Sequence, residues 1–97
     1  MITRIVRMEF REEAVTGFLQ TFENARDRIR NFEGCLSLQL MRDNDNKNLY
    51  STVSVWANAQ ALEKYRESQL FKETWEAAKK GFVNKPVAFS LEGDVRK

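Results

Sequence analysis

The spacing of apolar residues alternates between two periods along this chain, and this alternation constrains the fold more than any other feature. A period of two, typical of strands, runs through residues 2–10, 36–41, 49–56 and 87–92. A spacing of three or four, typical of a helix face, gives a first apolar stripe at Ala14, Phe18, Phe22, Ala25, Ile29 and Phe32. Helical spacing returns between residues 58 and 80. The predicted order is therefore strand, helix, strand, strand, helix, strand.

Local signals mark the ends of these segments. Gly34 is expected to stop the first helix, and the polar run 43–48 is expected to join the two middle strands in a hairpin. Asn58 is expected to cap the second helix, and Ser68 to cap a further helical turn after it. Pro86 opens the last strand, where proline is tolerated.

This order predicts an α+β fold, a ferredoxin-like βαββαβ chain with a four-stranded antiparallel sheet and both helices on one face. Apolar residues are expected on the other face as well. Arg4 and Ile5 interrupt the alternation of the first strand, so that Ile5 stands opposite Val6. Cys35 and Met41 are expected opposite the leucines of the second strand. An exposed apolar sheet face indicates a partner, and a homodimer formed face to face would cover it.

Size and charge narrow the classes of function. The 97 residues form one domain, 1–97. The net charge of +2 does not indicate a nucleic-acid partner, and no apolar run of membrane-spanning length occurs. The single cysteine, Cys35, cannot form an intrachain disulfide, which favours a reducing compartment and a cytoplasmic protein.

The sequence contains no histidine. Catalytic pairs of serine or cysteine with histidine, histidine metal ligands and a histidine ligand to haem iron are therefore all excluded. No cluster of cysteines is present to hold zinc or an iron–sulfur centre. We expect no metal and no cofactor.

Two segments carry a resemblance to a known family. The run from Val55 to Phe71, VWANAQALEKYRESQLF, and the run from Phe32 to Leu36, FEGCL, are similar to the antibiotic biosynthesis monooxygenase (ABM) superfamily. The resemblance implies a dimeric α+β barrel with a pocket between the sheet and the helices of each subunit. It also implies a cofactor-independent monooxygenase that oxidises a small aromatic or quinol-type substrate.

The chain departs from the family where histidines would stand. Many members have histidine at the position of Tyr65, and often another at that of Leu70. A branch that degrades haem has its iron-ligating histidine at the position of Trp75. Because this ligand is missing, haem degradation by that mechanism is disfavoured.

Aromatic and arginine side chains are the remaining candidates for the site. The catalytic candidates are Tyr65, Trp75 and Arg7, and the substrate-binding candidates are Trp56, Phe71, Phe22 and Arg66. Tyrosine can supply a hydroxyl, the indole N–H groups can orient an oxygen atom, and an arginine can favour a substrate anion. The competing interpretation is that the aromatic residues are ordinary core and that both arginines are solvated surface charges.

The alternative function is a non-catalytic dimeric barrel that binds a small hydrophobic ligand. The volume between sheet and helices tests both functions, because a pocket below about 300 Å3 would not hold a typical small ligand. Either way, a small aromatic molecule and a second copy of the chain are the expected partners.

Overall fold

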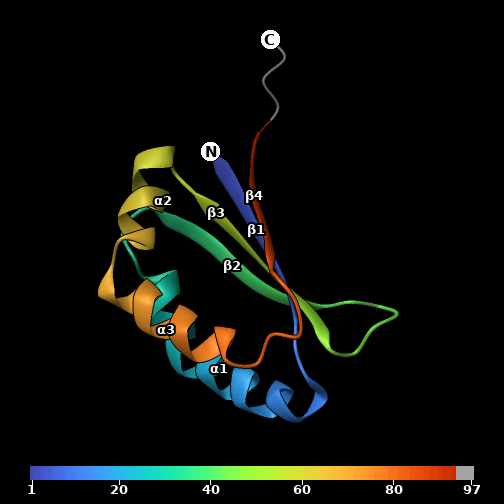
Figure 1. Ribbon diagram of the computed structural model, residues 1–97. Coiled ribbons are helices and arrows are strands. Elements are labelled where there is room, and N and C mark those ends of the chain that lie inside the picture. Colours follow the sequence, from blue (N-terminus) through green and yellow to red (C-terminus); the bar gives the residue numbers. More distant parts are fainter. Residues whose placement is uncertain (94–97) are drawn as a thin grey trace.

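The structure, a computed structural model that describes residues 1–93, is a four-stranded antiparallel sheet with three helices packed on one side (Figure 1). The strands are β1 (Ile2–Glu9), β2 (Cys35–Arg42), β3 (Leu49–Trp56) and β4 (Val87–Glu92). The helices are α1 (Val15–Arg30), α2 (Ala59–Arg66) and α3 (Gln69–Lys79), and a short 3-10 turn, η1 (Glu12–Ala14), leads into α1. The predicted α+β fold and the order of the strands are confirmed, and the predicted second helix is divided into two, α2 and α3.

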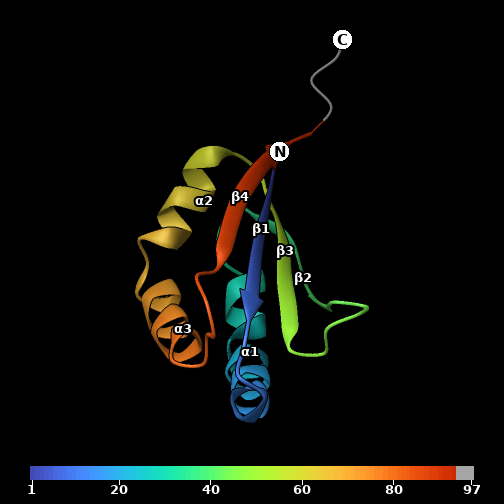
Figure 2. The ribbon, with the colours of Figure 1, turned by 45° about the vertical axis from the view of Figure 1, so that its right-hand side comes forward.

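The strand order is β2-β3-β1-β4, with β1 in the interior between β3 and β4. Figure 2 shows the helices on one side of this sheet, and no element of residues 1–93 on its other side. Alternate residues of β1 therefore point to different surroundings. Among residues 1–93, no helix has the length and apolar character needed to cross a membrane.

Helix ends follow the predicted caps in two cases and differ in a third. The side chains of Asn58 and Ser68 accept hydrogen bonds from the backbone N–H groups of Ala61 and Phe71, as expected of N-cap residues. The first helix ends earlier than predicted, at Arg30. Gly34 instead opens the second strand, with φ +89, and a Cβ there would collide with Ala61 of α2.

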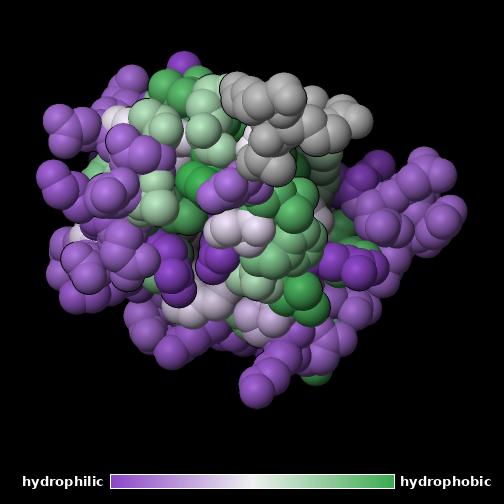
Figure 3. All heavy atoms as spheres, turned by 90° about the horizontal axis from the view of Figure 1, so that it is seen from above, coloured by the Kyte–Doolittle hydropathy of each residue, from purple (hydrophilic) through white to green (hydrophobic). Residues whose placement is uncertain are grey.

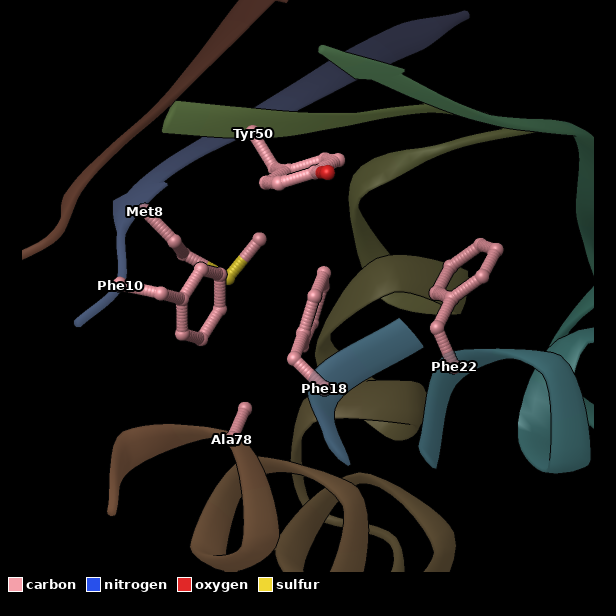
Figure 4. Close-up of a cluster of buried hydrophobic side chains, with 6 residues drawn as sticks. All are labelled: Met8, Phe10, Phe18, Phe22, Tyr50 and Ala78. Carbon is pink, nitrogen blue, oxygen red and sulfur yellow. The ribbon is translucent and has the colours of Figure 1, made fainter. Parts of the chain in front are cut away.

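The core has two parts. The larger is a cluster from β1 and the residue after it, α1, β3 and α3, drawn in Figure 4: Met8, Phe10, Phe18, Phe22, Tyr50 and Ala78. Within it the rings of Phe10 and Phe18 stack with centroids 4.2 Å apart. The smaller part is built from Cys35, Trp56 and Leu62.

Cys35 lies on the helix side of the sheet, so the prediction that it faces the other side is wrong. A register shift between Cys35 and Ser37 inserts one residue against β3. This bulge turns Cys35 inward, where it is buried, and leaves Leu36 exposed. Met41 is 49% exposed, on the face opposite Leu38 and Leu40, as predicted.

The sheet face turned away from the helices, here called the open face, is largely apolar. Its central residues alternate along the strands with inward-facing ones: Ile5, Val53, Val55, Val87, Phe89 and Leu91. Phe89 and Leu91 are 41% and 50% exposed. Figure 3 views the end of the molecule that carries the N-terminus, and hydrophobic residues gather there between hydrophilic rims over α2 and the β2–β3 turn. In this structure nothing covers the open face within residues 1–93.

Candidate functional site

A cavity of about 260 Å3 lies between the sheet and the three helices. Its apolar lining consists of Val6, Met8, Phe18, Phe22, Ile29, Leu38, Leu62, Phe71, Trp75, Ala78, Pro86 and Ala88. Its polar lining consists of Arg4, Thr52, Ser54, Tyr65, Arg66 and Thr74. A dry cavity of about 150 Å3 holds benzene, so this volume suits one ring or two fused rings. It lies below the volume of about 300 Å3 expected for a typical small ligand, so only ligands smaller than drug-sized ones fit.

Aromatic rings from α2 and α3 form one wall of the cavity. Tyr65 meets Phe71 edge to face with centroids 5.3 Å apart, and Phe71 stacks on Trp75 at 5.8 Å. Ser68 sets this arrangement because its hydroxyl donates to the carbonyl of Tyr65 at 2.6 Å and accepts from the N–H of Phe71 at 3.1 Å. The sequence-predicted residues Tyr65, Phe71, Trp75 and Phe22 are thus brought together in one lining.

Trp56 stands behind this wall. Trp56 is fully buried, at 0% exposure. Its ring stacks on that of Tyr65 with centroids 4.9 Å apart, and it does not line the cavity. Its indole N–H donates to the Ser54 hydroxyl at 2.9 Å. Trp56, a substrate-binding candidate from the sequence, is therefore placed as a support for Tyr65.

Arg7 does not line the cavity. It is exposed on the open face of the sheet, paired with Ser51 of β3 and Val87 of β4. The arginine of β1 that does line the cavity is Arg4, on the opposite face of the same strand. In the sequence Arg4 interrupts the apolar alternation of the first strand, and this interruption is the signal of a charged side chain on the inward face.

Arg4 and Arg66 stand together where the cavity opens. Arg66 is exposed, as is Ala88 of β4, which marks this side as the one that faces solvent. Arg4 donates from Nη1 to the Ser90 hydroxyl at 3.1 Å, and Arg66 lies 3.5 Å from the Glu63 carboxylate. Burial and then the positive charge of Arg66 lower the pKa of Arg4, while Glu63 opposes the change. The two guanidinium groups are thus close enough to repel each other.

Tyr65 is held in its neutral form. Burial, and then the nearby Cys35, raises its pKa to about 12, so at neutral pH the phenol is protonated and can donate a hydrogen bond. Within residues 1–93 the Tyr65 hydroxyl makes no hydrogen bond. No buried polar atom there lacks a partner, so this oxygen is not fully enclosed. Burial also raises the pKa of the Cys35 thiol, with Arg30 opposing.

Sequence reasoning missed three inward-facing hydroxyl residues, Thr52, Ser54 and Thr74. Thr52 and Ser54 share the period-two face of β3 with the buried Tyr50 and Trp56, and this pattern could have placed them inward. Ser54 accepts from Trp56, and its own hydroxyl hydrogen is left for a ligand. Thr74 donates to the Leu70 carbonyl at 2.8 Å.

No group of three cysteine, aspartate or glutamate side chains converges as a metal site in the part of the chain that the structure describes. The polar groups of the cavity are nitrogen donors and hydroxyls. Such a lining suits an organic ligand with an oxygen acceptor better than it suits a metal ion.

Comparison with known proteins identifies the family. A family model described as antibiotic biosynthesis monooxygenase matches residues 1–77. Among solved structures, an antibiotic biosynthesis monooxygenase superposes with a TM-score of 0.90 at 15% identity, covering 97% of this chain and 99% of the other. A Caulobacter crescentus candidate member gives 0.90 at 21% identity, with 96% and 89% covered. A Mycobacterium tuberculosis protein gives 0.89 at 16% identity, with 98% and 96% covered.

Among curated proteins, none matches the sequence significantly. The structural likenesses, all at low identity, establish the shared fold, and the match of the family model over most of the sequence establishes membership. This chain belongs to the antibiotic biosynthesis monooxygenase family.

Proposed function

We propose that this protein is a cofactor-independent monooxygenase that oxidises a small aromatic or quinol-type molecule in the cavity between sheet and helices. The observation that carries the proposal is the cavity itself, an apolar, aromatic-walled space with two arginines at its opening. Its volume of about 260 Å3 favours substrates of one or two rings over larger polycyclic ones.

The reaction needs no external reductant because the substrate supplies the electrons. A phenolate or enolate passes one electron to dioxygen, and the resulting radicals recombine to form a C–O bond. Loss of water from the peroxide gives the carbonyl product, so one oxygen atom enters the substrate and the other leaves as water. In this balance a quinol and dioxygen give a hydroxyquinone and water.

The protein's part is to exclude water, orient the ring and favour the substrate anion. Phe71 and Trp75 supply flat surfaces for stacking, and the guanidinium of Arg4 supplies positive charge beside the apolar interior. Tyr65, neutral below a pH of about 12, is assigned as a donor to the reduced oxygen. Since the lining holds no base, the substrate must ionise without one.

The test is oxygen uptake with a panel of one-ring and two-ring quinols, together with isotopically labelled dioxygen to trace the inserted atom. We expect uptake above the spontaneous rate, with label in the product, and a fall of about ten-fold or more in Tyr65→Phe or Trp75→Phe. Tyr50→Phe is the matched control, because Tyr50 is buried in the core outside the cavity. Uptake no faster than in buffer across the panel would contradict the proposal.

A second candidate, a non-catalytic barrel that binds a small hydrophobic ligand, is favoured by one observation. Within residues 1–93 the lining holds no carboxylate and no thiol, so it offers no side chain of the kinds that usually take a proton from a substrate. Calorimetric binding of the same quinols without oxygen uptake would support this candidate.

We also propose that the protein is a homodimer formed through the open face, and that it is cytoplasmic. The exposed Phe89 and Leu91 beside Ile5 form an apolar surface, which matches a second copy of itself. The buried free thiol of Cys35 fits a reducing compartment.

A further inference from the structure

Arg4 is placed unusually for an arginine of a small sheet. It lies on the face of β1 that points to the helices, between Ser54 of β3 and Ser90 of β4. Its one side-chain hydrogen bond within residues 1–93 goes to the Ser90 hydroxyl, and no carboxylate pairs with it there. A guanidinium has five N–H donors, so most of its binding capacity is left for a ligand.

Arg66 brings a second guanidinium to the same opening from the last turn of α2. Glu63 lies 3.5 Å from it, which offsets one of the two positive charges and leaves the opening with a net positive charge. The charge of Arg66 also lowers the pKa of Arg4, which locates the two groups near each other. An anion that binds between two like charges lowers their mutual repulsion, so this pair of positive charges favours an anionic ligand.

We infer that the ligand of this cavity is an aromatic carboxylate, whose ring lies among Phe22, Phe71 and Trp75 and whose carboxylate is bound by Arg4 and Arg66 at the opening. The inference rests on the proposed function and narrows its substrate to a hydroxylated one- or two-ring acid. The guanidinium fork matches both carboxylates and phosphates, and a carboxylate is assigned because its single charge equals the one net positive charge that Arg4, Arg66 and Glu63 leave at the opening. The part of the ligand inside the cavity should be uncharged, because the interior lining is too apolar to hold a charge in addition to the carboxylate at the opening.

The experiment is calorimetric titration of the purified full chain with a hydroxynaphthoate, its primary amide and a naphthyl phosphate, all under anaerobic conditions. The acid and the amide share a shape and differ in charge. We expect the acid to bind about ten- to hundred-fold more tightly than the amide, the range for charge-assisted hydrogen bonds. Arg4→Gln and Arg66→Gln should each remove most of this preference.

Arg7→Gln is the matched control, because Arg7 lies on the open face of the same strand and should leave the preference unchanged. Circular dichroism and unfolding midpoints of the variants check that each is folded. Equal affinity for acid and amide, or an unchanged preference in Arg4→Gln and Arg66→Gln, overturns the inference. Tighter binding of the phosphate than of the carboxylate also overturns it.

Failure of this inference is distinguishable from failure of the proposed function. Binding is measured without oxygen, so a preference for the acid supports the inference even when oxygen uptake is absent. Oxygen uptake with neutral quinols, combined with equal affinity for acid and amide, supports the monooxygenase and rejects the inference that the ligand is a carboxylate.

Discussion

At the scale of single residues, Tyr65 has the largest change of environment, because burial raises the pKa of its hydroxyl. Its ring is enclosed by Trp56, Phe32 and Phe71, at centroid distances of 4.9, 5.5 and 5.3 Å. An ionised phenolate in this surrounding loses its hydration and gains no cation within hydrogen-bond reach. The raised pKa is therefore a property of the aromatic enclosure, and it fixes the residue as a donor.

This proton predicts how stability depends on pH. The unfolded chain ionises Tyr65 near pH 10.0 and the folded chain near pH 12, so the folded state binds more protons between these values. Stability from this group is fully present below pH 10.0 and is lost as pH rises toward about 12. Two pKa units correspond to about 2 to 3 kcal/mol.

Urea unfolding of the wild type and of Tyr65→Phe, compared at about pH 9 and about pH 12, measures the effect. The wild type should lose about 2 kcal/mol more than the variant over this interval, since only the wild type carries the Tyr65 hydroxyl and the two chains are otherwise identical. Parallel losses in the two proteins would show that the phenol is solvated.

At the scale of elements, the junction of α2 and α3 shapes the cavity wall. The hydroxyl of Ser68 caps α3 through Phe71 and closes α2 through Tyr65. Ser68→Ala should lower the free energy of unfolding by about 1 kcal/mol and weaken ligand binding several-fold, because both wall residues are released.

Asn58→Ala is the control for this prediction. Asn58 caps the start of α2 with a bond of 2.8 Å to the N–H of Ala61, and neither residue lines the cavity. Its removal should cost about as much stability as that of Ser68 and leave ligand affinity unchanged. Equal effects of the two variants on affinity would mean that the junction does not position the wall.

The elements themselves could be predicted from the sequence because each depends on local periodicity. The stripe from Phe18 to Ile29 can bury its apolar face only as a helix, and the caps at Asn58 and Ser68 are short-range hydrogen bonds. The bulge at Cys35 could not be predicted, since it depends on how Cys35 and Ser37 pair with Trp56 and Val55, which lie far along the chain.

The site was only partly predictable for a related reason. Period two shows which side chains share a strand face and does not show which face the helices cover. Arg7 followed the polar alternation and lies outside the cavity, whereas Arg4 broke it and lies inside. Trp56 was expected at the ligand because it is large and amphipathic, and tertiary packing placed it behind Tyr65 with Ser54 as its partner.

At the scale of the whole molecule, one sheet performs two separate tasks. The inward side of β1 presents Arg4, Val6 and Met8 to the cavity, and the outward side presents Ile5 and its neighbours to the surroundings. Because side chains alternate strictly, a substitution on one face leaves the other face unchanged. Ligand binding and self-association can therefore be tested independently.

The homodimer proposal predicts that Phe89→Glu yields a monomer. Phe89 is 41% exposed on the open face beside Ile5, and burial of such a ring contributes about 2 kcal/mol. Two-fold symmetry places each substitution twice in the interface, so the loss is about 4 kcal/mol, or about a thousand-fold in the dimer dissociation constant.

Sedimentation equilibrium at micromolar concentration provides the measurement, with Leu19→Glu as the matched control. Leu19 is 38% exposed on α1, away from the sheet. Leu19→Glu therefore makes the same change of charge as Phe89→Glu and removes a similar amount of exposed apolar surface. The wild type and Leu19→Glu should sediment as dimers and Phe89→Glu as a monomer that retains the affinity of its cavity for ligand. A specific interface is disrupted by a substitution within it and not by one at a similarly exposed residue elsewhere. A monomeric wild type, or equal dissociation caused by both substitutions, would therefore show that the open face is not the contact between subunits.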